Sequence, residues 1–158
     1  KVVVDYPDFA EETTVVDRSL DDPPEIRRVL TTKDLLGFRE VVKEIYVDRM
    51  VREYAVGLTM ATREPARFNL APLAPYISFG ASPRASIYLI HAGRALALLR
   101  GRRYLLPGDV RDVAADVLRH RISLTYEALA EEVSTERMVS DVIASVPEPP
   151  VELAEQSA

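Results

Sequence analysis

The sequence predicts an all-α protein, a small bundle of about five to seven helices with a short extended segment at its N-terminus. Apolar side chains recur every three or four residues in several separate segments. Ser, Thr, Asp or Pro stands at the start of most of these segments, and Gly or Pro follows several of them, as at helix boundaries. The 158 residues, 47% of them hydrophobic, suffice for one core but not for two sizeable domains.

The N-terminal residues predict an extended stretch, one helix and a linker. Residues 1–5, KVVVD, are short and β-branched, which favours an extended segment. Asp8 followed by Glu11 is typical of a helix start, and it predicts a helix over about 8–19. Two prolines end the segment 21–24, DDPP, and exclude helix there.

Two helices are predicted next, and their spacing suggests a helical hairpin. Thr32 is expected to cap the first, which extends to about residue 46, and Asp48 the second. The apolar faces expected to be buried are Leu35, Leu36, Phe38, Val41, Val42 and Ile45 in the first helix and Val51, Tyr54, Ala55, Leu58 and Ala61 in the second. Residues 63–80, with three prolines and no sustained period, predict a long loop packed through Phe68 and Tyr76.

The clearest helix follows Ser82, the expected N-cap, with Pro83 at the first helical position and Gly101 after its end. It is apolar on nearly every side, which predicts the central helix of the bundle.

Three helical segments are expected after it: one from Pro107 to Arg121, a short turn near 124–132, and a helix over 134–145. We therefore expect residues 1–7 to be a junction, 8–146 a helical domain, and 147–158 a disordered tail.

Charge and composition exclude several classes of protein. The net charge of −5 argues against a general nucleic-acid binder, although residues 26–126 carry +8 between acidic ends of −6 and −7. The chain has no cysteine and no apolar run of membrane-spanning length, so we expect a cytoplasmic location and no membrane span. Because the first residue is Lys1 and not Met, we expect a piece of a longer polypeptide.

Arg84 is the strongest candidate for chemistry. It falls in the first turn of the central helix, where a cation is locally unfavourable unless an anion such as phosphate docks there. An arginine that reaches an acidic side chain elsewhere in the fold is an equally good interpretation. Arg84, Tyr88, His91 and Arg94 share one stripe of that helix, which could face a ligand, a neighbouring domain or only solvent.

Other chemistry has little support in the sequence. His91 and His120 are the only histidines, and neither has a carboxylate at ligand spacing, so no metal site is expected. The basic segment 100–104, RGRRY, is explained by compensation of the helix dipole and by solubility. The chain contains no Gly-rich phosphate loop and no nucleophile elbow.

Several blocks resemble the MoxR family of AAA+ ATPases, and the resemblance covers most of the chain. The segment GASPRAS at 80–86 is similar to the start of a helix in the family's lid subdomain. The other similar blocks are VDYP (4–7) followed by Glu11 and Glu12, ATR (61–63), RALA (94–97), LRGR (99–102), PGDV (107–110), VLRHR (117–121) and ASVP (144–147).

The resemblance implies that Arg84 is the second sensor arginine, which reaches the terminal phosphates of ATP, with Ser82 and Pro83 fixing the helix start. It implies ATP with Mg²⁺ as the ligand of the intact protein. The residues that bind the phosphates and magnesium belong to the core, which this sequence lacks, so this chain alone is not expected to hydrolyse ATP.

The resemblance also implies partners: the AAA+ core of the same polypeptide, neighbouring subunits of a ring that is often hexameric, and proteins with von Willebrand factor A domains. The function it implies is a chaperone-like remodelling machine. The alternative from a different class is an independent helical module that binds an acidic protein or nucleic acid through the basic middle of the chain.

Overall fold

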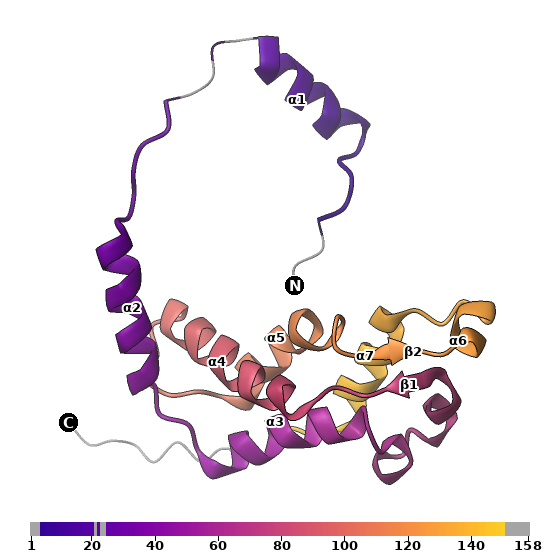
Figure 1. The fold of residues 1–158 in the computed structure, drawn as a ribbon. Coiled ribbons are helices and arrows are strands. Elements are labelled where there is room, and N and C mark those ends of the chain that lie inside the picture. Colours follow the sequence, from indigo (N-terminus) through magenta and orange to yellow (C-terminus); the bar gives the residue numbers. More distant parts are fainter. Residues whose placement is uncertain (1–3, 21, 23–24, 151–158) are drawn as a thin grey trace. The chain divides into compact units, whose positions relative to one another are not determined.

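The computed structural model describes residues 4–20, 22 and 25–150, and it contains seven α-helices within them (Figure 1). By contacts between Cα atoms the chain divides into two units, one ending at Arg39 and one starting at Glu40. No helix in the described part of the chain is long and apolar enough to cross a membrane. The all-α prediction is confirmed, with only a two-stranded sheet in addition.

The unit that starts at Glu40 is built around four helices: α3 (Arg49–Ala61), α4 (Pro83–Leu99), α5 (Pro107–Leu118) and α7 (Thr135–Ser145). Helix α4 packs against both α3 and α5, and α5 packs against α7 (Figure 1). The largest fully buried side chains come from all four helices and their flanks: Ile45, Leu58, Leu89, Leu105, Leu118, Met138, Val51, Val110, Val139, Val142, Thr59 and Thr62. The predicted inner face of α3 is confirmed in full.

Helix boundaries in this unit follow the predicted signals closely. Asp48 accepts a hydrogen bond from the Met50 amide at 2.7 Å and caps α3. Gly101 has a φ of +72° after the end of α4, a left-handed conformation that glycine adopts without strain. Ser134 caps α7 by accepting from the Arg137 amide at 3.2 Å. These short-range signals act within one turn, so the sequence alone reveals them.

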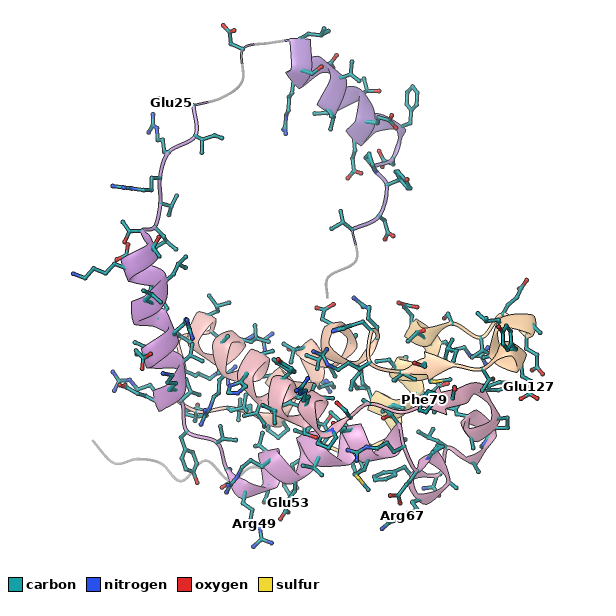
Figure 2. All side chains as sticks on the ribbon, in the orientation of Figure 1. Glu25, Arg49, Glu53, Arg67, Phe79 and Glu127 are labelled. Carbon is teal, nitrogen blue, oxygen red and sulfur yellow. The ribbon has the colours of Figure 1, made fainter. Side chains whose placement is uncertain are left out.

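The prediction of a loop over residues 63–80 is wrong. The segment forms two 3₁₀-helices, η1 (Pro65–Phe68) and η2 (Ala71–Tyr76), and the strand β1 (Ile77–Phe79). Strand β1 pairs antiparallel with β2 (Ser123–Leu124), which leads into the short helix α6 (Tyr126–Ala130). Figure 2 labels Phe79 on β1 and Glu127 on α6. The expected packing of Phe68 and Tyr76 against the core is confirmed.

Side-chain hydrogen bonds fasten this segment to α6. The Tyr76 hydroxyl donates to Glu131 at 2.6 Å, and the Thr125 hydroxyl donates to the Pro75 carbonyl at 2.9 Å. The hydrogen bond to the Glu131 carboxylate raises the pKa of Tyr76 above its ordinary value. Both bonds join residues at least 50 positions apart, so no local sequence pattern predicts them.

The unit that ends at Arg39 contains α1 (Phe9–Leu20) and the first part of α2 (Thr32–Glu44). The predicted capping pair of α1 is confirmed, because the Glu11 amide donates to Asp8 at 2.8 Å and the Asp8 amide to Glu11 at 3.1 Å. The expected extended segment begins in residues 1–3, which lie outside the described residues.

Two expectations for α2 need correction. Its cap is Thr31, not Thr32, because the Thr31 hydroxyl accepts from the Asp34 amide and Asp34 in turn accepts from the Thr31 amide. Most of its predicted apolar face is also not buried: Leu35, Leu36, Phe38 and Val41 are 42–53% exposed, and only Ile45, directly after the helix, is buried as predicted. The spacing of apolar residues in the sequence therefore predicted the helix correctly. It did not show whether another element covers the apolar face of that helix.

Candidate functional site

Arg84 lies in the first turn of α4, as predicted, and its side chain is exposed. Among the described residues no carboxylate pairs with its guanidinium, and no hydrogen bond occupies it. Ser82 stands at the N-cap with extended backbone, but its side chain makes no capping hydrogen bond. Pro83 occupies the first helical position. The interpretation of Arg84 as half of an internal ion pair is therefore wrong for the described part of the chain.

Two buried threonines fix the place where α4 begins. The Ala81 amide donates to the Thr62 hydroxyl at 2.9 Å, and that hydroxyl donates to the Thr59 carbonyl at 2.7 Å. The Ser86 hydroxyl donates to the Thr59 hydroxyl at 2.9 Å. These bonds join the end of α3 to both sides of the first turn of α4. We call Thr59 and Thr62 the threonine strap.

The backbone at Gly80 passes so close to α3 that only glycine fits. A Cβ atom there would lie 2.4 Å from the Thr62 carbonyl oxygen and 2.8 Å from Cγ of Arg63. Such distances lie far inside van der Waals contact. Gly80 and the threonine strap together hold the segment 80–83 firmly against the end of α3, so the direction in which Arg84 leaves the helix is set by a rigid base.

The polar stripe predicted on α4 is present in part. Arg84, Tyr88 and His91 are exposed on one face, whereas Arg94 is half-buried and its Nε has no hydrogen-bond partner. The face also carries Ile87, so it is not purely polar. Helix α4 thus packs against α3 and α5 on one side and leaves this mixed face uncovered within its own unit, less enclosed than a fully central helix.

A cation–π contact that the sequence did not predict lies beside this stripe. The guanidinium carbon of Arg121 is 4.8 Å from the centre of the Tyr88 ring. The two residues flank a shallow groove of about 340 Å³ between α4 and α5, which Val113, Asp116 and His120 help to line. In the sequence, Arg121 stands out only as part of the block VLRHR at 117–121, and nothing in that block points to Tyr88.

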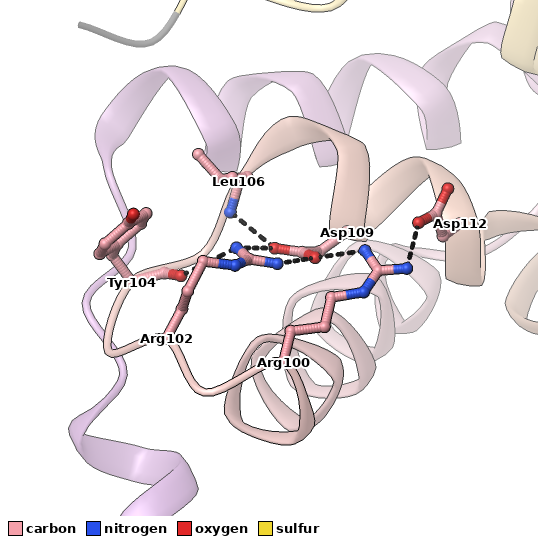
Figure 3. Close-up of polar contacts among 6 residues, drawn as sticks. All are labelled: Arg100, Arg102, Tyr104, Leu106, Asp109 and Asp112. Carbon is pink, nitrogen blue, oxygen red and sulfur yellow. Dashed lines mark hydrogen bonds and ion pairs between the residues drawn. The ribbon is translucent and has the colours of Figure 1, made fainter. Parts of the chain in front are cut away.

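The basic segment after α4 has a structural role more specific than the one predicted for it (Figure 3). The fully buried carboxylate of Asp109 accepts hydrogen bonds from Arg102 at 2.5 and 2.6 Å and from Arg100 at 2.7 Å. It also accepts from the Leu106 amide at 3.0 Å, which closes the start of α5. Arg100 pairs in addition with Asp112. The segment therefore locks the turn between α4 and α5.

Opposing effects set the pKa of Asp109. Burial is the largest of them and raises it, but the hydrogen bonds from Arg102, the Leu106 amide and Arg100 lower it. The result is a pKa below the ordinary value for aspartate. A carboxylate that stays ionised while fully buried is a structural anchor and has no proton to exchange near neutral pH.

The described residues contain no cluster of three His, Cys, Asp or Glu side chains that could hold a metal ion. The features left for chemistry are the unpaired guanidinium of Arg84, the exposed face of α4 and the Tyr88–Arg121 pair. These groups can bind an anion but hold no nucleophile or base with an orienting partner.

Comparison with known proteins identifies the family of this domain. The family model described as the AAA lid domain matches residues 73–142. Chaperone MoxR1 of Mycobacterium tuberculosis is 41% identical over 156 residues, which cover 99% of this chain and 41% of that protein. Protein MoxR of Paracoccus denitrificans is 39% identical over 105 residues, 63% of this chain and 31% of that protein.

A solved structure has the same fold. The crystal structure of an ATPase candidate from Cytophaga hutchinsonii superposes with a TM-score of 0.86 at 33% identity, over 93% of this chain and 45% of that one. The chain spans less than half the length of each of these relatives. On these grounds the chain belongs to the MoxR family of AAA+ ATPases and corresponds to the lid domain of its members.

Proposed function

We propose that this chain covers ATP bound at the AAA+ core of the same polypeptide, and that Arg84 contributes the second sensor arginine. The observation that carries the proposal is an exposed guanidinium without a partner among the described residues, at the start of a helix with no side-chain cap. The first amides of a helix and an arginine both favour an anion, and a phosphate satisfies both.

The threonine strap supports the same role. An arginine that must meet a phosphate in a defined geometry needs a fixed base, because misplacement weakens the contact. The base of Arg84 is held by the bonds from Ala81 and Ser86 to Thr62 and Thr59. In this proposal Ser82 and Pro83 set the helix start and present its amides, and Mg²⁺ is held by the core.

The relatives support a proposal for the wider role. We propose a ring of subunits with chaperone-like remodelling activity, because one relative is described as a chaperone and another as an ATPase candidate. A hexameric ring and partners with von Willebrand factor A domains rest on the family resemblance. In this proposal Arg84 binds the terminal phosphate when it is present, and this contact moves the lid. Helices α3 and α4 move together as one body.

The test is Arg84→Ala in the full-length ATPase. Loss of one cationic contact to a transferring phosphoryl group costs a few kcal/mol, so we expect the hydrolysis rate to fall by about several hundredfold. Because the side chain is exposed, the thermal unfolding midpoint should stay unchanged by circular dichroism. Arg52→Ala, which removes an exposed arginine from α3, is the matched control.

Wild-type turnover in Arg84→Ala would contradict the sensor role. Tight, salt-sensitive binding of DNA or RNA by the present chain, at a Kd below about 1 µM in physiological salt, would favour the independent binding module instead.

A further inference from the structure

A tyrosine one helical turn from Arg84 holds a second arginine beside the same face of α4. Tyr88 follows Arg84 by four residues, so their Cβ atoms are neighbours at about 5–6 Å on the surface of α4. The Arg121 guanidinium stacks on the Tyr88 ring at 4.8 Å. Tyr88 is 48% exposed, so the stacked pair lies at the surface and not in the core.

The guanidinium of Arg121 has N–H groups that no described acceptor uses. Its Nη1 donates to the Val117 carbonyl and lies against the imidazole of His120. Its hydrogen bonds to described residues all leave from Nη1, so Nε and Nη2 carry N–H groups that no described acceptor uses. A planar guanidinium that is stacked on an aromatic ring loses little further freedom when it binds an oxyanion.

The acid that lines the groove beside Arg121 forms its ion pair with another arginine. Asp116, which lines the same groove, pairs with Arg119 at 2.6 Å. Glu136 lies 3.6 Å from the other side of Arg119. No described carboxylate pairs with Arg121. The positive charge is therefore held in place by an aromatic ring and a backbone carbonyl, and its electrostatic attraction remains available to an external anion.

We propose that Arg121 is a second phosphate-binding arginine of this lid, and that Tyr88 is its positioning residue. This inference rests on the proposed function, because it assigns Arg121 to the same bound ATP that Arg84 contacts. Its chemistry differs from that of Arg84. An arginine that binds phosphates equally before and during hydrolysis strengthens binding and leaves the chemical step unchanged, whereas the sensor arginine is expected to act on the rate.

The experiment measures binding and turnover separately in the full-length ATPase. We expect Arg121→Gln to raise both the Kd for Mg·ATP, measured with a fluorescent analogue, and KM by about tenfold, with kcat within about twofold. Arg49→Gln is the matched control, because it removes an exposed arginine on α3 that pairs with Glu53 (Figure 2) and should leave Kd unchanged.

Tyr88 is tested through the ring and not the hydroxyl. Tyr88→Phe keeps the stacking surface and should bind Mg·ATP like the wild type, whereas Tyr88→Leu should weaken binding by about three- to fivefold, the scale of a cation–π contact. The double variant Tyr88→Leu/Arg121→Gln should bind no more weakly than Arg121→Gln alone, because the ring acts only through the guanidinium. Thermal melting by circular dichroism verifies that each variant is folded.

The outcomes separate this inference from the proposed function. An unchanged Kd in Arg121→Gln overturns the second arginine even if Arg84→Ala is inactive. A loss of kcat with unchanged Kd in Arg121→Gln also overturns it, because the residue then acts elsewhere than on bound phosphate. A raised Kd in Arg121→Gln together with an active Arg84→Ala supports Arg121 and removes the sensor role.

Discussion

At the scale of single residues, arginine occurs in two opposite settings in this chain. Arg100 and Arg102 are committed to a buried carboxylate, whereas Arg84 and Arg121 have no acidic partner in the described part of the chain. Composition cannot separate the two groups, because the partner that distinguishes them, Asp109, lies seven to nine positions away. Charge counts along the sequence therefore described the basic middle correctly. They could not tell the arginines that pair with a buried carboxylate from those without an acidic partner among the described residues.

Asp109→Asn should destabilise the unit that starts at Glu40. The change keeps the volume of the side chain but removes the charge that two arginines share. We expect the free energy of unfolding in urea to fall by about 2–3 kcal/mol. Asp112→Asn is the control, because its carboxylate is partly exposed and, among the described residues, pairs with Arg100 alone, and an exposed pair contributes about 0–1 kcal/mol.

The effect of Asp109→Asn should depend on pH. The pKa of Asp109 is lowered in the folded state, so its stabilising contribution is complete above the unfolded value of about 3.9 and is lost as the pH falls through the folded value. The difference between wild type and variant should be full at pH 7 and shrink progressively below about pH 4. A difference that stays constant from pH 7 to the lowest pH reached would contradict the ionised anchor.

At the scale of elements, the sequence predicted most of what is local and missed what is distant. The capping pair of Asp8 and Glu11, the cap at Asp48 and the glycine after α4 each act within one turn, and the structure confirms all three. The fold of residues 63–80 depends on β2 and α6, some 50 residues later, so its composition looked like a loop. The extent of each helix was predictable, but what covers its apolar face was not.

The candidate site divides in the same way. The position of Arg84 in the first turn of α4 was predictable, because Ser82 and Pro83 mark the start of that helix in the sequence. The Tyr88–Arg121 contact joins residues 33 positions apart, and only the packing of α4 against α5 brings them together.

Gly80→Ala should damage the junction between α3 and α4. The added methyl group would overlap the Thr62 carbonyl, which belongs to the backbone and cannot rotate away. We expect a loss of about 1–3 kcal/mol in the free energy of unfolding and faster amide exchange at Ala81.

Gly108→Ala is the comparison for this junction. The nearest atom to a new Cβ there is Glu148 Oε2 at 3.9 Å, an ordinary contact. If Gly80→Ala were as stable as Gly108→Ala, the close approach at Gly80 would not matter.

At the scale of the whole molecule, the buried apolar residues are not spread along the entire chain. The core cluster begins at Ile45 and ends at Val146, so every member belongs to the unit that starts at Glu40. The unit that ends at Arg39 has no buried side chain in α1, and its large apolar residues are exposed, among them Phe9, Leu20, Ile26 and Val29.

Removal of residues 1–39 should therefore leave the remaining chain folded. We expect residues 40–158 to melt cooperatively, with a midpoint within a few degrees of that of the longer chain, because no member of the core cluster is lost. Limited proteolysis of the longer chain should cut first before residue 40. A deletion variant that loses its cooperative transition would show that residues 1–39 contribute to the core.

The threonine strap has a mechanical consequence. Helix α3 has 13 residues and is about 20 Å long, and α4 is tied to its very end by bonds that water does not reach. A small displacement of the start of α4 is therefore passed to the end of α3, and the two helices tilt together. Because α3 is about 20 Å long, the end of α3 that is far from the threonine strap is displaced the most.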